Sequence, residues 1–125
     1  MLESEITKIN LRKMVISFYT KVLKDDLVGP FFIDRLGDDL GGAIWGDHLD
    51  LLTDFWASFT LGDMNYRGNP FAPHINMQGL QRETFEQWIK LFHETLDSVY
   101  EPQVADQLKQ RSEIIAGNFM RNLAL

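Results

Sequence analysis

Apolar residues at helical spacing run through most of this 125-residue chain. They recur every three or four positions along four stretches, which span residues 9–22, 44–59, 85–99 and 104–119. This spacing places them on one face of a helix, and no stretch alternates for long enough to indicate a strand. The pattern therefore predicts an all-α fold with four substantial helices, a short N-terminal helix and short turns around Pro30. The length predicts one domain over residues 1–125.

One stretch, residues 62–79, departs from this pattern. Its sequence, GDMNYRGNPFAPHINMQG, holds three of the nine glycines and two of the four prolines, so neither a long helix nor a clean strand is expected. About twenty residues without regular structure are uncommon in a compact domain and usually indicate a functional loop. His74 lies at its centre, near Phe71, Ile75 and Met77. An imidazole in apolar surroundings suggests a metal ligand, and a surface histidine in a flexible loop is the alternative.

Composition and charge exclude several classes of function. The chain carries 18 acidic and 12 basic residues, a formal net charge of −6, which disfavours nucleic acid and anionic membranes as partners. It has no cysteine, which excludes disulfides, thiol nucleophiles, zinc ribbons and iron–sulfur clusters. The polar, acidic N-terminus does not resemble a signal peptide, and no apolar run reaches membrane-spanning length. We therefore expect a soluble, cytoplasmic protein.

Three polar-tipped side chains lie on the apolar faces of three different predicted helices. They are Tyr19, His48 and Trp88. Each must find a hydrogen-bond partner if it is buried. Taken singly, each is explained by packing, with His48 as a core histidine bonded to a backbone carbonyl. Together they would place three hydrogen-bonding groups around a small polar ligand. His93 lies on a different face, and we expect it to be exposed and without a special role.

The histidine and aromatic content bears on which metal centre could form. Zinc would need all three histidines, or two of them with a carboxylate, and the sequence contains no His-x-x-x-His pair. Haem needs as little as one protein ligand and a wide apolar pocket. The chain has nine phenylalanines, three tyrosines and three tryptophans, which can supply such a pocket. A loop histidine with so many aromatics therefore favours haem.

Three runs of sequence carry a family resemblance: FYTKVLKDDLVGPFF, WGDHLDLLTDFWASFTLGDMNYRGNPFAPH and FEQWIKLFHETLDSVY. In this order the chain resembles the truncated haemoglobins, most closely the group III (P-type) bacterial branch, over residues 18–119. The resemblance implies a truncated globin, a two-over-two helical sandwich with a long loop in place of most of the proximal helix. Groups I and II of this family often carry glycine pairs at helix junctions, whereas group III proteins commonly lack them. This chain has a single pair, Gly41–Gly42, near the start of the second apolar stretch, which supports the group III branch.

The resemblance also implies roles for individual residues. His74 would ligate the iron of haem b, and Phe32 would wedge the haem plane, with the adjacent Phe31 as the alternative register. Arg35, Arg67 and Arg82 are all candidates to anchor the haem propionates. The remaining implied residues are the pocket-lining Leu52, Phe55 and Trp56 and the distal, ligand-facing Tyr19, His48 and Trp88.

The implied function is binding of a diatomic gas, O2 and also CO or NO. A distal pocket with several hydrogen-bond donors suits ligand retention, redox chemistry or detoxification of NO better than bulk oxygen delivery. The resemblance leaves open a peroxidase-like or nitric-oxide dioxygenase-like activity, with a reductase as partner, in a monomeric protein. Two alternatives remain: a cofactor-free helical interaction module, and a non-haem metal hydrolase.

Overall fold

The regular structure of the chain is helical. The computed structural model describes residues 1–66, 68, 74 and 77–125, and in this part the only β-pairing is an isolated bridge between Glu3 and Tyr100. The four long helices match the four apolar stretches, so the all-α prediction is confirmed. In chain order the helices are α1 (Lys8–Val22), α2 (Gly29–Leu36), α3 (Ala43–Thr60), α4 (Arg82–Val99) and α5 (Pro102–Asn122).

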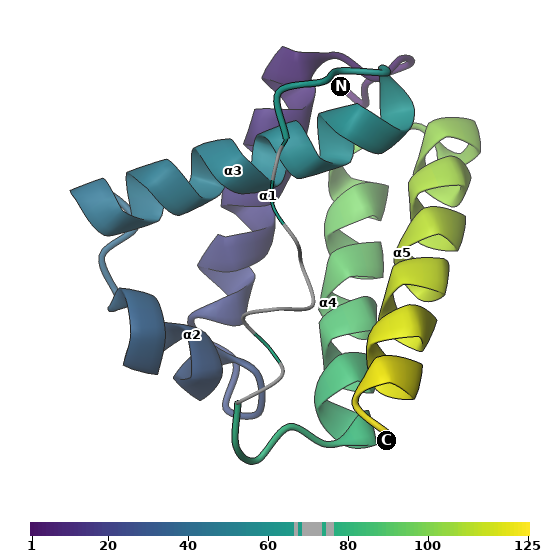
Figure 1. Ribbon diagram of the computed structural model, residues 1–125. Helices are drawn as coiled ribbons and strands as arrows, with labels where there is room; N and C mark the ends of the chain where they lie inside the picture. The colour runs from purple at the N-terminus through teal and green to yellow at the C-terminus, as the bar shows by residue number, and fades with distance from the viewer. Residues whose placement is uncertain (67, 69–73, 75–76) are drawn as a thin grey trace.

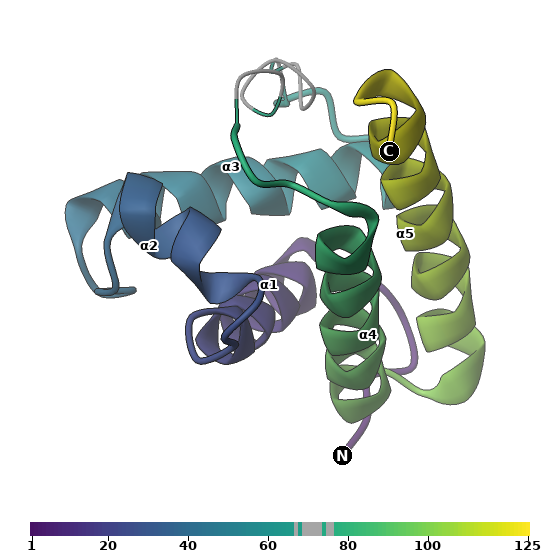
Figure 2. The same ribbon diagram turned by 90° about the horizontal axis from the view of Figure 1, so that it is seen from below.

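The four long helices form two packed pairs. Helix α1 packs against α3 and α4 against α5, and contacts between α1 and α4 join the pairs. Figure 1 shows α4 and α5 side by side, with α3 running across their direction and α2 below α3; in Figure 2, seen from below, α2 lies in front of α3. The core between the pairs is apolar, and Leu11, Met14, Phe92 and Leu96 are fully buried in it. None of the helices in the described part of the chain is long and apolar enough to cross a bilayer.

The prediction of a short N-terminal helix is wrong. The Glu3 N–H donates to the Val99 carbonyl at 2.8 Å, and the Glu3 carbonyl accepts from the Glu101 N–H at 2.9 Å. Close by, the Tyr100 hydroxyl donates to Asn10 Oδ1 at 2.8 Å. The backbone at Glu3 therefore bonds to the junction between α4 and α5 instead of forming a helical turn of its own.

Around Pro30 the sequence predicts turns, whereas the structure contains the helix α2 there. Pro30 lies in its first turn, where no backbone N–H is required. The Asp25 carboxylate accepts hydrogen bonds from the N–H groups of Leu27 (3.0 Å) and Val28 (2.8 Å), and from Gln87 Nε2 of α4 (2.7 Å). Partial burial alone would raise the pKa of the Asp25 carboxyl, but these hydrogen bonds outweigh it and lower the pKa. Asp25 thus fixes the start of α2 against α4.

A long connection joins α3 to α4. Gly62 and Gly79, near its two ends, have φ angles of +69° and +86°, a left-handed conformation that glycine adopts without steric cost. At the α3 end, Lys8 binds Asp54 at 2.8 Å and Asp63 at 2.9 Å, which holds the connection to the start of α1. In the fold that the resemblance implies, a long loop replaces most of the proximal helix. The connection between α3 and α4 corresponds to that loop.

Candidate ligand-binding cavity

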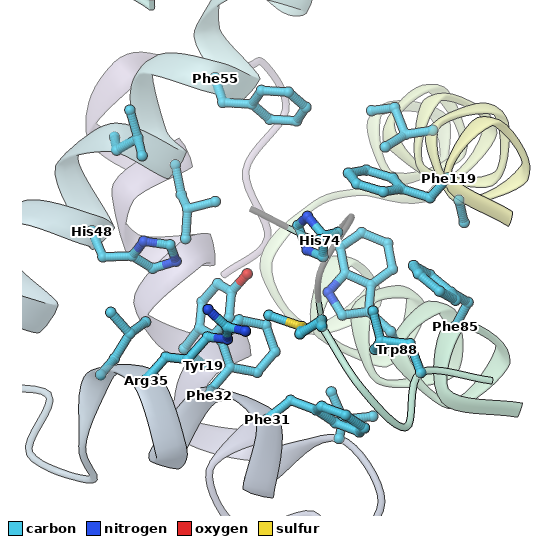
Figure 3. Close-up of a pocket in the computed structure, with 18 of the residues that line it drawn as sticks. Tyr19, Phe31, Phe32, Arg35, His48, Phe55, His74, Phe85, Trp88 and Phe119 are labelled. Carbon is cyan, nitrogen blue, oxygen red and sulfur yellow. The ribbon is translucent and has the colours of Figure 1, made fainter. Parts of the chain in front are cut away.

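A cavity of about 560 Å³ lies among the helices and the α3–α4 connection. Its volume falls within the range of roughly 300–1,000 Å³ typical of small-molecule and cofactor sites. The residues that the resemblance implies for iron ligation, pocket lining and ligand contact all lie in its wall, and Figure 3 shows most of them directed into it. They are Tyr19, Phe32, His48, Leu52, Phe55, Trp56, His74 and Trp88.

His74 reaches the cavity from the α3–α4 connection. Its ring meets the Phe119 ring of α5 edge-on, with 4.7 Å between the centroids and 69° between the planes. Phe119 in turn stacks on Phe85 of α4 at 5.9 Å. The aromatic pair forms an apolar wall beside the imidazole, and Figure 3 shows His74 next to Phe119. An imidazole presented from such surroundings is suited to binding a metal.

Tyr19 presents its hydroxyl to the cavity from α1 and is only 5% exposed. Edge-on contacts with Phe18 (4.8 Å) and Phe32 (5.1 Å) hold its ring in place. Burial raises the pKa of the Tyr19 hydroxyl well above its usual range, and an interaction with the Trp88 indole offsets part of that rise. The hydroxyl therefore stays protonated at neutral pH and can donate a hydrogen bond to a ligand in the cavity.

His48 of α3 lies beside Tyr19, with 6.1 Å between the ring centroids. Its Nε2 atom is buried and has no hydrogen-bond partner among the described residues. The sequence alone suggested a core histidine bonded to a backbone carbonyl. Within the described part of the chain, the Nε2 atom of His48 makes no such bond. Burial lowers the pKa of His48, and the nearby His74 imidazole lowers it further. A buried polar atom without a partner is unusual in a native fold and is expected where a ligand supplies the partner.

Trp88 is fixed by a stack of aromatic rings. It stacks on Phe92 with 5.1 Å between the centroids and only 10° between the planes, and its edge meets Phe18 at 5.4 Å. Trp56 stacks on Phe92 at 4.9 Å. This packing holds the Trp88 indole where its N–H interacts with the Tyr19 hydroxyl. Trp88 therefore both packs in the core and presents a polar group to the cavity.

The three candidate propionate anchors have different surroundings. Arg35 lines the cavity from the last turn of α2. Arg82 instead donates to the Leu125 carbonyl at 3.4 Å and does not line the cavity. Arg67 lies outside the described residues.

Sequence reasoning missed a large part of the cavity wall. The apolar stretch over residues 104–119 indicates one apolar helix face, and periodicity alone does not show whether such a face meets protein or a cavity. Met77, singled out beside His74, does line the cavity, whereas Phe71 and Ile75 lie outside the described residues. The other lining residues are Val28, Phe31, Leu36, Leu51, Tyr66, Gly68, Leu80, Thr84, Phe85, Ile115, Ala116 and Phe119.

The non-haem metal hydrolase requires a cluster of ligands. Within the described residues, no group of three His, Cys, Asp or Glu side chains is placed to hold a metal ion. His93 lies between α4 and α5, with Nε2 3.3 Å from Ser112 Oγ, and is not in the cavity wall. It is partly buried, not exposed as the sequence suggested. The two histidines that do line the cavity are His48 and His74.

Comparison with known proteins places the chain in a family. No protein-family model matches it. It is 34% identical over 118 residues to the group 3 truncated hemoglobin ctb of Campylobacter jejuni, an alignment that covers 94% of this chain and 91% of that protein. The fold superposes on the crystal structure of a group III truncated hemoglobin from Campylobacter jejuni with a TM-score of 0.92 and 33% identity, covering 98% of this chain and 95% of the other. The chain therefore belongs to the group III truncated haemoglobins, and its fold is that of a truncated globin.

Proposed function

We propose that residues 1–125 form one globin domain that binds haem b through His74 and holds a diatomic gas, O2 and also CO or NO, beside Tyr19, Trp88 and His48. Membership of a haemoglobin family supports haem and gas binding. The observation that carries the proposal for individual residues is their convergence. These four polar side chains, from three helices and one connection, meet in a single cavity whose wall is otherwise largely apolar.

The cavity wall suits haem. A haem needs as little as one protein ligand and a wide apolar pocket, which His74 and a wall including Phe32, Leu52, Phe55 and Trp56 can supply. The partnerless Nε2 of His48 provides a separate indication that a ligand is missing from the described contacts. When bound, haem supplies an iron centre that binds diatomic gases.

The polar side chains would stabilise the gas ligand. The Trp88 indole interacts with the Tyr19 hydroxyl, and the protonated Tyr19 O–H can donate to a ligand in the cavity. Preorganised donors stabilise negative charge on the atom that they face. Neutral His48 adds a third polar contact at its Nε2. These residues favour ligand retention, redox chemistry or NO detoxification over bulk oxygen delivery.

Titration of the purified protein with haemin tests this proposal. We expect saturation at one haemin per chain and, after reduction, a Soret band that shifts on addition of CO. The His74→Ala variant should lose or strongly alter this band. His93→Ala is the matched control, because His93 lies outside the cavity wall, and it should behave as the wild type. Extraction of the bound cofactor into alkaline pyridine identifies haem b by its spectrum. Absence of stoichiometric binding would contradict the proposal and favour the cofactor-free interaction module.

A further inference from the structure

Arg35 is the only residue with a permanent charge among the described residues that line the cavity. It lies in the last turn of α2, and Figure 3 shows its side chain extending from that helix toward the middle of the cavity. Arg35 is also an exposed residue. It therefore marks a place where the apolar cavity meets solvent.

No partner for this guanidinium is found in the described part of the chain. The ion pairs formed there involve Lys8, Arg12, His93 and Lys109, and none includes Arg35. The guanidinium is always protonated at physiological pH, and its planar fork of N–H donors matches a carboxylate. A guanidinium at the solvent edge of an apolar cavity, with no ion-pair partner among the described residues, is placed to bind an anionic group that a ligand brings to that edge.

A second hollow, of about 520 Å³, adjoins the cavity at this edge. It shares Phe31, Arg35 and Met77 with the main cavity, and its other lining residues include Asp34 and Gln78. The surroundings thus change from apolar to polar across Arg35. A molecule with an apolar body and carboxylates on one side would place the body among the aromatic rings and the carboxylates near Arg35.

We propose that Arg35 binds a propionate carboxylate of the haem and so sets which edge of the haem faces α2. This inference rests on the proposed function, because it takes haem b, with its two propionates, as the ligand. It selects Arg35 over Arg82, which donates to the C-terminal Leu125 carbonyl and is absent from the cavity wall. The pair forms near solvent, so its contribution is smaller than that of a buried ion pair.

The rate of haem loss tests the assignment. Wild type, Arg35→Gln, Arg35→Lys and the control Arg82→Gln are loaded with haemin and mixed with an excess of an apo-globin scavenger, and transfer of haemin is followed by absorbance. We expect Arg35→Gln to lose haemin about two- to fivefold faster than wild type, as for a solvent-exposed ion pair. Arg35→Lys, which keeps the charge without the fork, should lie between them. Arg82→Gln should match the wild type.

Haemin dimethyl ester, in which both carboxylates are masked, separates charge recognition from packing. With the ester, wild type and Arg35→Gln should release the cofactor at equal rates. Equal rates of haemin loss from wild type and Arg35→Gln would overturn the inference. A difference between these two proteins that persists with the ester would also overturn it. Failure of the wild type to bind haemin would overturn the proposed function together with this inference. Binding without a carboxylate-dependent effect overturns the inference alone.

Discussion

Replacing Tyr19 and Trp88, singly and together, measures how the two side chains act on a gas ligand. Tyr19→Phe removes the hydroxyl but keeps a ring that can contact Phe18 (4.8 Å) and Phe32 (5.1 Å). Trp88→Phe removes the indole N–H and keeps an aromatic ring that can stack on Phe92. Both variants should therefore fold, which circular dichroism and thermal melting can verify. Their main effect should fall on the ligand.

The size of the effect follows from the hydrogen bonds. A hydrogen bond to a charged acceptor contributes about 1.5–3 kcal/mol, and each ~1.4 kcal/mol corresponds to a factor of ten in rate. Tyr19→Phe should therefore accelerate O2 release by about 10- to 150-fold. The Trp88 indole interacts with the Tyr19 hydroxyl, so part of its effect should pass through Tyr19. The acceleration of O2 release in the double variant should therefore be smaller than the two single-variant accelerations multiplied together. The expected coupling free energy between Tyr19 and Trp88 is about 0.5–3 kcal/mol.

The assay is stopped-flow displacement of O2 by CO from the reduced, haem-loaded proteins. The proposed donor network requires two results: a faster release in Tyr19→Phe and a non-additive double variant. An unchanged release rate in Tyr19→Phe would show that its hydroxyl does not donate to the ligand. Strictly additive effects would show that Trp88 and Tyr19 act independently, contrary to the contact between them.

Three further predictions concern the fold that holds the cavity. Asp25→Asn should lower the free energy of unfolding by about 1 kcal/mol at neutral pH, because it weakens the hydrogen bonds that the Asp25 carboxylate accepts from the Leu27 and Val28 N–H groups just before α2. The pKa of Asp25 is lowered in the folded state. The stability difference between wild type and variant should therefore be full above about pH 4, the unfolded pKa, and disappear as the pH falls through the folded pKa. Urea unfolding at several pH values measures it. Tyr100→Phe should cost about 1–2 kcal/mol in the same assay, because Asn10 Oδ1 loses a buried donor at 2.8 Å. Trp45→Phe should cost a similar ~1–2 kcal/mol, because the indole of this fully buried residue donates to the Gly37 carbonyl at 2.7 Å between α2 and α3.

The long helices were predictable because each buries a continuous apolar face, which leaves a period of three to four residues in the sequence. Helix α2 was missed because it has eight residues and begins at Gly29 and Pro30, a pair that usually indicates a turn. Pro30 in the first turn, a position that proline favours in helices, was the signal that could have found it. The extended N-terminus could not be predicted in this way, since it depends on the distant Tyr100 region.

The candidate site shows a similar division. Taken singly, His48 was explained as a core histidine, and only its combination with Tyr19 and Trp88 on three apolar faces, together with the family resemblance, indicated a ligand site. The structure brings these side chains into one cavity, while their roles toward haem and ligand stay predictions. The contribution of α5 was missed because Phe119 continues an apolar stripe, and a stripe has the same spacing whether it faces another helix or a ligand.

The infrared C–O stretching frequency of the reduced, CO-bound protein tests the central claim most directly. It reports at once that a haem-bound ligand is present and whether hydrogen-bond donors face it, because a donor aimed at the ligand oxygen lowers the frequency. We predict a low frequency in the wild type and a clear rise in Tyr19→Phe, with His93→Ala unchanged. No CO complex, or the same frequency in wild type and Tyr19→Phe, would contradict the account.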